Sequence, residues 1–371
     1  MDAFPGKRES DREARMIEMP REIVVGENAL EKVPDVLKKL KLSGNTYIIT
    51  GRQTNIVAGE RIREMTEAES GCIGKCGTYI SEKATPEEVS AILDEVSGTD
   101  PCCLLGVGSG RSIDLAKLSS KKLGIPFLSI PTAASHDGIV SSRASIHSDG
   151  ESKSVDAQSP MAVIADTTII SKAPYRLLAA GCGDVISNYT SVLDWELASR
   201  LLNEPFSAVS SSMALMSAEL ITESADLIHP SEEIVGMGVS PEAARLVIQA
   251  LVTSGMAMSF AGSSRPASGA EHMFSHALDH ITQRPALHGV QCAVGSIMMM
   301  YLHGGDWNLL RETMIRLGIP TSAEEMGIPD EDIVEALLAA PGIRPERYTI
   351  LGKGLTRPAA EKMAKITKVI P

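Results

Sequence analysis

The stretch from Pro101 to Leu123, PCCLLGVGSGRSIDLAKLSSKKL, decides how the first half of the chain is expected to fold. It opens with an apolar run from Cys103 to Val107 that is typical of a buried strand, and closely spaced glycines then lead into a helical pattern. Glycines let the backbone approach an anion closely, and the first N–H groups of a helix lack partners within the helix. The turn therefore predicts a seat for a diphosphate. Its spacing, G-x-G-x-G, differs from the usual dinucleotide pattern, so a tight turn without a ligand is the alternative.

Strand and helix patterns alternate around this stretch. The predicted strands are residues 23–25, 47–50, 103–107, 126–130 and 163–165. A helix is expected from Asn28, as its cap, to about Lys41, and another begins with Thr85 as cap and Pro86 in the first turn. Such alternation predicts a parallel sheet covered by helices on both faces.

The strand signal fades after about Pro174. Helical patterns follow at residues 189–203, 205–229, 241–260, 271–282 and 290–303. We therefore expect a Rossmann-like α/β domain at residues 1–172 and an all-α domain at residues 173–371. The active site is expected in the cleft between them.

The charge balance limits the classes of partner. The 371 residues carry 35 Lys and Arg against 47 Asp and Glu, a net charge of −12, which argues against a broad nucleic-acid surface. The longest uncharged run, between Arg245 and Arg265, contains many polar residues and is weak as a membrane span. Six cysteines are too few for a disulfide scaffold, and Met1 to Arg21 is charged, unlike a signal peptide. We expect a cytoplasmic protein that neither binds nucleic acid nor inserts into a membrane.

A second polar segment, PTAASHDG at residues 131–138, follows the predicted strand at 126–130. Open α/β sheets bind ligands at the carboxyl ends of their strands, so its small hydroxyl residues and Asp137 are candidate ligand contacts. A polar loop with a simple Asp-Gly turn is the alternative.

The histidines give the strongest sign of chemistry. His272 and His276 lie four residues apart on one helix face, His288 follows 16 residues after His272, and Asp184 lies upstream. Three protein ligands with one open position are typical of a catalytic zinc ion. The spacing leaves open whether His272 or His276 is the ligand. We interpret Cys182 and Cys292 as core residues and not as ligands.

Taken in order, these motifs resemble the superfamily of dehydroquinate synthase, glycerol dehydrogenase and iron-type alcohol dehydrogenases. Within it, the chain is most similar to the archaeal-type sn-glycerol-1-phosphate dehydrogenases. The motifs that carry the resemblance are the glycine turn to Asp114, residues 131–138, Gly183-Asp184, residues 268–279 and His288-Gly289.

The resemblance implies a dehydroquinate synthase-like fold and a set of site residues. One zinc ion per subunit would bind Asp184, His272 and His288. Asp137 and His276 would be catalytic residues in contact with the substrate. Asp184 would contact the substrate as well as the metal. NADPH or NADH would lie against Gly110, Arg111, Ser112, Ile113, Asp114, Thr132, Ala133, Ala134, Ser135 and Ser141.

Two positions separate the branches of this superfamily. Dehydroquinate synthases use Glu where this chain has Asp184, and iron-type alcohol dehydrogenases have a further His where this chain has Asn188. The resemblance thus implies reduction of the phosphorylated ketone dihydroxyacetone phosphate to sn-glycerol 1-phosphate, for archaeal membrane lipids, by a homo-oligomer. The alternatives are a glycerol or polyol dehydrogenase, a dehydroquinate-synthase-like lyase, and a metal- or nucleotide-binding module that is not an enzyme.

Arginines are candidates for the two phosphates involved. The strand at 47–50 ends in Gly51-Arg52 without an acid for the ribose hydroxyls, so we hypothesise that Arg52 meets a 2′-phosphate, that NADPH is used well and that NADH is tolerated. Arg265 and Arg143 are candidates for the substrate phosphate, with a solvated surface arginine as the alternative for each.

Overall fold

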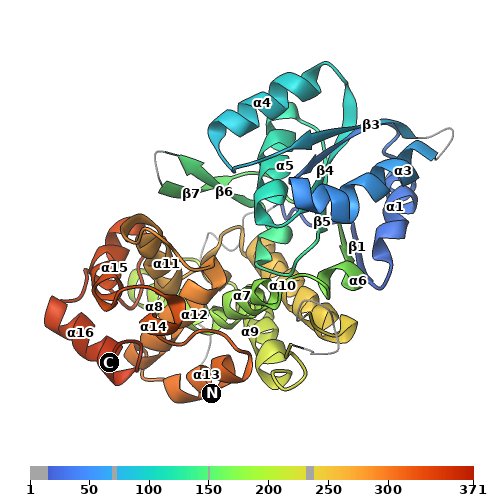
Figure 1. The fold of residues 1–371 in the computed structure, drawn as a ribbon. Helices are drawn as coiled ribbons and strands as arrows, with labels where there is room; N and C mark the ends of the chain where they lie inside the picture. Colours follow the sequence, from blue (N-terminus) through green and yellow to red (C-terminus); the bar gives the residue numbers. More distant parts are fainter. Residues whose placement is uncertain (1–15, 69–72, 149–150, 231–237) are drawn as a thin grey trace.

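The structure, a computed structural model, describes residues 16–68, 73–148, 151–230 and 238–371. Figure 1 shows a sheet with helices on both faces above a second, helical part of the molecule. Most of the N-terminal segment Met1 to Arg21, which we expect not to be a signal peptide, lies outside the described residues.

Within the described residues the main sheet has six parallel strands in the order β1-β8-β5-β4-β2-β3. The predicted strands are all found, and the glycine-rich β3 is an addition that its sequence did not indicate. The strands are β1 (Glu22–Gly26), β2 (Gly44–Thr50), β3 (Ile73–Ile80), β4 (Pro101–Gly108), β5 (Phe127–Pro131) and β8 (Ala162–Asp166).

Side chains of β4 alternate between two cores, as the pleat of a strand requires. Leu105 packs in a core with Leu37 of α1 and Ile62 of α3, and Leu104 packs in a core with Ile92 of α4 and Ile113 of α5. The helices around the sheet are α1 (Val33–Lys39), α2 (Arg52–Thr54), the π-helix η3 (Asn55–Gly59), α3 (Glu60–Ala68), α4 (Pro86–Ser97), α5 (Gly110–Leu123) and α6 (Thr167–Ile170).

One of the two predicted caps is correct. Thr85 accepts a hydrogen bond from the backbone N–H of Glu88 at 3.3 Å and begins α4. The prediction that Asn28 caps a helix is wrong: its backbone is left-handed, and the 3₁₀ turn η2 (Ala29–Lys32) follows it. The carboxylate of Asp166, at the end of β8, accepts the N–H of Leu30 at 2.9 Å and takes the place of that cap.

A hairpin of β6 (Arg143–Ser148) and β7 (Glu151–Asp156) leaves the sheet after the short turn η4 (Asp137–Ile139). β6 packs against α5, and β7 contacts α11 in the helical part. The sequence analysis did not predict this hairpin, which joins the two parts beside the predicted site.

The helical part contains every helix predicted there, although the one predicted at 205–229 covers only Ala208–Glu223. Its elements are α7 (Tyr175–Ile186), α8 (Asn188–Leu202), α9 (Ala208–Glu223), α10 (Pro241–Ala261), η5 (Arg265–Ala267), α11 (Ala270–Ile281), α12 (His288–Leu302), α13 (Trp307–Arg316), α14 (Ala323–Met326), α15 (Asp330–Ile343) and α16 (Arg357–Ile366). The predicted fold class is confirmed. The domain boundary at residues 172 and 173 stays a prediction.

Among the described residues, α10 is the one helix long and apolar enough to cross a membrane by length and composition. Within its apolar window, 61% of the residues are buried inside the fold. The helix belongs to the core, where Val247, Ile248 and Leu251 pack in the same cluster as Leu104 of the sheet.

Candidate active site

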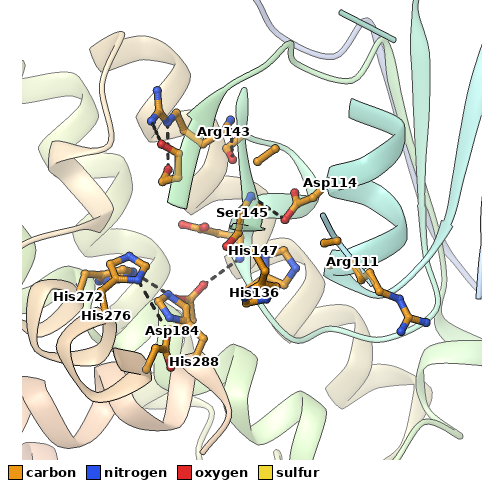
Figure 2. A pocket seen from close by; sticks show the side chains of 18 of the residues that line it. Arg111, Asp114, His136, Arg143, Ser145, His147, Asp184, His272, His276 and His288 are labelled. Atoms are coloured by element: carbon orange, nitrogen blue, oxygen red, sulfur yellow. Dashed lines mark hydrogen bonds and ion pairs between the residues drawn. The ribbon is translucent and has the colours of Figure 1, made fainter. Parts of the chain in front are cut away.

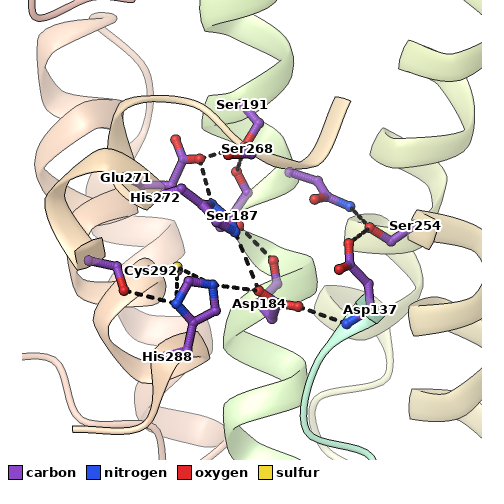
Figure 3. A network of polar contacts seen from close by, with 12 residues as sticks. Asp137, Asp184, Ser187, Ser191, Ser254, Ser268, Glu271, His272, His288 and Cys292 are labelled. Atoms are coloured by element: carbon purple, nitrogen blue, oxygen red, sulfur yellow. Dashed lines mark hydrogen bonds and ion pairs between the residues drawn. The ribbon is translucent and has the colours of Figure 1, made fainter. Parts of the chain in front are cut away.

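Three helices bring the predicted metal ligands together. Asp184 comes from α7, His272 from α11 and His288 from α12 (Figure 3). Oδ1 of Asp184 lies 3.6 Å from Nε2 of His272 and 3.9 Å from Nε2 of His288. Ligand atoms about 2 Å from a tetrahedral zinc ion lie roughly 3.4 Å from one another. The spacing of these three side chains therefore fits a small metal ion.

Glycines allow this arrangement because α7 and α12 meet backbone to backbone. A Cβ on Gly289 would lie 1.9 Å from the carbonyl oxygen of Ala180, and one on Gly183 would lie 2.4 Å from the carbonyl oxygen of Gly289. Larger residues would separate the helices, and Asp184 would then move away from His288.

The outward nitrogen of each histidine is held by a neighbour. Nδ1 of His272 lies 3.0 Å from Oε1 of Glu271, and Nδ1 of His288 lies 3.1 Å from Oγ of Ser275. Such contacts fix the ring orientation and leave both Nε2 atoms for a metal. The hydrogen bonds of the two Nδ1 atoms therefore also fit a metal site.

Glu271 itself is fully buried in a set of donors. Its carboxylate accepts hydrogen bonds from Oγ of Ser191 at 2.6 Å, Oγ1 of Thr190 at 2.9 Å and the backbone N–H of Gly269 at 2.5 Å. The sequence analysis did not single it out, although it directly precedes His272.

Three further side chains adjoin the metal group, by which we mean Asp184, His272 and His288. Sγ of Cys292 lies 3.5 Å from Nε2 of His288, so this buried thiol belongs to the same group of possible ligands, although we had interpreted it as a core residue. His276 and Asp279 form a second possible group with His288. Burial and the neighbouring His288 hold the pKa of His276 well below its ordinary value.

Asp137 adjoins the metal group from the loop after β5. Its backbone N–H donates to Oδ2 of Asp184 at 2.9 Å, and Oγ of Ser254 donates to its carboxylate at 2.8 Å. Nδ2 of Asn188 in turn donates to Oγ of Ser254 at 2.9 Å. Burial and the charge of Asp184 raise the pKa of Asp137 to about 7.

The glycine turn lies at the other end of the same space. A cavity of about 760 Å³ is lined by residues of both parts of the molecule (Figure 2). Figure 2 shows Arg111 and Asp114 on the side of the sheet and His272, His276 and His288 on the helical side. The backbone at Gly108 has a φ of +144°, and a Cβ on Gly110 would lie 2.3 Å from Nε2 of His136.

The structure places the predicted nucleotide contacts in two groups. Gly110, Arg111, Asp114 and Ser141 line the cavity. The other predicted contacts lie at the start of α5 or directly after β5 and do not line the cavity: Ser112, Ile113, Thr132, Ala133, Ala134 and Ser135. Their roles stay predictions.

Asp114 already has protein partners. Its Oδ1 lies 3.1 Å from Nζ of Lys117, and its Oδ2 accepts the backbone N–H of Ser145 at 3.0 Å. Lys117 is fully buried and also donates to the carbonyl oxygens of Gly138 at 2.6 Å and Arg143 at 2.5 Å. The sequence analysis missed this lysine, because its spacing from Asp114 is that of an ordinary helix surface pair.

The arginine candidates have different surroundings. Arg265 is 4% exposed, and its guanidinium binds both carboxylate oxygens of Glu204. It does not line the cavity, so the expectation that it holds a phosphate is wrong. Arg143 does line the cavity, as does Arg344, which the sequence analysis missed. Arg52 is exposed at the end of β2 and lies 3.0 Å from Glu82.

Sequence comparison assigns the family. The chain is 57% identical over 357 residues to the glycerol-1-phosphate dehydrogenase [NAD(P)+] of Methanosarcina mazei, covering 96% of this chain and 97% of that protein. The chain belongs to the glycerol-1-phosphate dehydrogenase family. The member from Methanothermobacter thermautotrophicus is 50% identical, with 96% and 99% of the two chains covered. Residues 24–174 also match the family of iron-containing alcohol dehydrogenases.

Solved structures show the same fold as this family member. The glycerol dehydrogenase of Schizosaccharomyces pombe superposes with a TM-score of 0.77 at 21% identity, covering 96% of this chain and 90% of that one. A probable glycerol dehydrogenase of Sinorhizobium meliloti gives 0.76 at 19% identity, covering 96% and 100%. At these identities the likeness concerns the fold alone.

Proposed function

We propose that this protein is an oxidoreductase that reduces dihydroxyacetone phosphate to sn-glycerol 1-phosphate with NADPH or NADH. The product would supply the glycerophosphate backbone of archaeal membrane lipids. One observation carries the proposal. A chain that is 57% identical over nearly its whole length to a glycerol-1-phosphate dehydrogenase also has a cavity that joins the glycine turn to Asp184, His272 and His288. We further propose that the enzyme works in the cytoplasm as a homo-oligomer.

Asp184, His272 and His288 would hold one zinc ion per subunit. Carboxylate and imidazole ligands with an open position suit zinc, which as a Lewis acid polarises a ketone oxygen. The buried contacts of Glu271 with His272 and of Ser275 with His288 support this set, because they orient both Nε2 atoms toward Asp184.

The chain's own residues would position the substrate and move its proton. Ser254 and the link to Asp184 fix Asp137 at the cavity, where its carboxylate would hold a substrate hydroxyl. His276 lines the same cavity and would contact the substrate. After hydride transfer from the nicotinamide, the new hydroxyl oxygen would receive its proton through His276 or a bound water.

The experiment is a reductase assay with the zinc-loaded protein. NADPH and dihydroxyacetone phosphate are mixed with it, and the absorbance of the reduced nicotinamide is followed. The product is then offered to a dehydrogenase specific for the opposite enantiomer, sn-glycerol 3-phosphate. We expect oxidation of NADPH and a product that the second enzyme does not use.

Two outcomes would favour the alternatives. Turnover of unphosphorylated glycerol with no gain from the phosphate would indicate a polyol dehydrogenase of the same superfamily. Conversion without net oxidation of the nicotinamide would indicate a dehydroquinate-synthase-like lyase, in which the nucleotide carries hydride only transiently.

A further inference from the structure

The cavity at the metal group continues into a second space of about 880 Å³. Both spaces are lined by Ser141, Arg143, Ser154, Met258, Ser264, His276 and Arg344, so His276 lies where they join. A substrate whose ketone oxygen lies at Asp184, His272 and His288 could therefore extend past His276 toward the arginines.

Three arginines converge on this extension: Arg143 at the start of β6, and Arg344 and Arg347 after α15. Their hydrogen-bond acceptors are mainly neutral. Arg143 donates to the carbonyl oxygen of Ser154 at 2.6 Å, Arg347 donates to that of Ser268 at 2.5 Å, and Arg344 donates to the hydroxyl of Ser264 at 3.4 Å.

Three arginines line this space together with two carboxylates, those of Asp156 and Glu346, so the positive charge is the larger. Among the described residues, neither Arg344 nor Arg347 has a carboxylate oxygen within 4.0 Å, the limit for an ion pair. The carboxylate nearest Arg143 is that of Asp156 at 3.9 Å, and it also pairs with Lys121. Arg265, by contrast, is neutralised by Glu204.

The electrostatics agree with this geometry. Burial and the nearby Arg143 lower the pKa of Arg344, and burial and Arg344 lower the pKa of Arg347 to about 9. Clustered guanidinium groups with neutral partners favour an anion, and the fork of an arginine matches two oxygens of a phosphate.

We propose that Arg344 and Arg143 bind the phosphate group of the substrate, with Arg347 adding positive charge behind them. The proposal rests on the proposed function and names the residues that select a phosphorylated ketone over an unphosphorylated one. Because Arg143 follows the sheet and Arg344 follows α15, the phosphate would link the two parts of the molecule.

The same chemistry could come from a phosphate of the nucleotide. The glycine turn, where a diphosphate is expected, lines the cavity on the side of Gly110 and Arg111, and neither of these residues lines the extension. We therefore expect changes at Arg344 to affect the ketone and not the nucleotide.

The experiment compares Arg344→Met and Arg344→Lys with Arg316→Met, a control at an arginine of α13 that pairs with Asp226 away from the cavity. For each variant, kcat and KM are measured with dihydroxyacetone phosphate, with dihydroxyacetone and with NADPH. Inhibition by inorganic phosphate, zinc content and the thermal midpoint are also measured.

We expect Arg344→Met to raise KM for dihydroxyacetone phosphate about 10- to 100-fold, the range for lost hydrogen bonds to a charged group. KM for NADPH, zinc content and the thermal midpoint should stay near those of the control. Arg344→Lys should restore part of the loss, because it keeps the charge but not the fork, and competitive inhibition by phosphate should weaken in Arg344→Met.

Two results would overturn this inference while leaving the proposed function intact. One is a wild-type enzyme that prefers the phosphorylated ketone together with an Arg344→Met variant that keeps the same preference. The other is a rise confined to KM for NADPH, which would assign the arginines to the nucleotide. If the wild-type protein does not reduce dihydroxyacetone phosphate, the proposed function itself fails, whatever the variants do.

Discussion

At the scale of single residues, the metal group depends on a carboxylate that no solvent reaches. Glu271 is 0% exposed and takes the hydrogen bond of His272 together with three others. We expect Glu271→Gln to weaken zinc binding about 10- to 100-fold, because a neutral amide holds the imidazole less firmly. Competition with a chromophoric chelator measures this affinity. Glu312→Gln, at an exposed position of α13, is the control. Equal affinities in the two variants would contradict the role given to Glu271.

A second prediction concerns the choice of nucleotide. Arg52 and its partner Glu82 are both exposed, so the guanidinium can exchange this ion pair for a 2′-phosphate at the end of β2. We expect Arg52→Asp to raise KM for NADPH about tenfold or more, while KM for NADH changes much less. Arg61→Asp, at an exposed arginine of α3, serves as the control. Equal changes for the two nucleotides would refute the hypothesis.

Individual residues were predictable where chemistry repeats along the sequence. The spacing of Asp184, His272 and His288 could be read as a metal group, but it did not distinguish His272 from His276. Arg265 was misjudged because its partner Glu204 lies 61 residues away, and Arg344 was missed because no local pattern marks it. Long-range pairing decides which arginine is free, and one sequence does not contain it.

At the scale of elements, α5 is fastened to the loop and hairpin that carry Asp137 and Arg143. Lys117 forms this link by donating to the carbonyl oxygens of Gly138 in the loop and Arg143 in the hairpin, while it also pairs with Asp114 on α5. We expect Lys117→Met to lower the free energy of unfolding by about 3–5 kcal/mol, because it leaves the charge of Asp114 buried without its partner.

Lys121→Met is the matched control, one helical turn further along α5, where the ion pair with Asp156 is exposed. That variant should cost less than about 1 kcal/mol. Urea titrations followed by circular dichroism give both values. Similar losses in the two variants would show that Lys117 contributes no more than a surface lysine.

The regular elements were largely predictable, because periodicity and caps are local. The apolar strands β4, β5 and β8 and the helix that Thr85 begins follow directly from their sequences. The β6–β7 hairpin, with the sequences RASIHS and ESKSVD, has few apolar residues, and a pattern this short did not mark it as a pair of strands. Ile146 nevertheless joins the core, and the hairpin is placed by its contacts with α5 and α11.

At the scale of the whole molecule, the two parts share one core and one cavity. The cluster that contains Leu104 of the sheet also contains Phe274 of α11, so the parts are packed against each other beside the site. The order of the parts was predictable from the change in pattern near Pro174. A site in the cleft between the parts was expected as well, but the residues of the hairpin that line the cavity were not, because they depend on how the hairpin and α11 meet.

Association is also a property of this scale. Leu201 and Leu202 at the end of α8, and Val209 and Met216 of α9, are each more than half exposed, and these two helices pack together. Together with the homo-oligomer that the family resemblance implies, this apolar surface leads us to expect a molar mass in light scattering that is a multiple of the single chain. The mass of one chain across a range of concentrations would contradict this.

The position of β1 has a consequence for synthesis on the ribosome. β1 is one of the two edge strands of the main sheet, and its hydrogen-bonded neighbour β8 pairs Ala162 with Glu22, 140 residues earlier in the chain. At roughly 5–20 residues per second, β1 waits on the order of 7–28 s after its own translation before that neighbour is made. During this interval its open edge is exposed to other nascent chains. Chaperones that bind extended segments therefore have their opportunity at the beginning of this protein's translation.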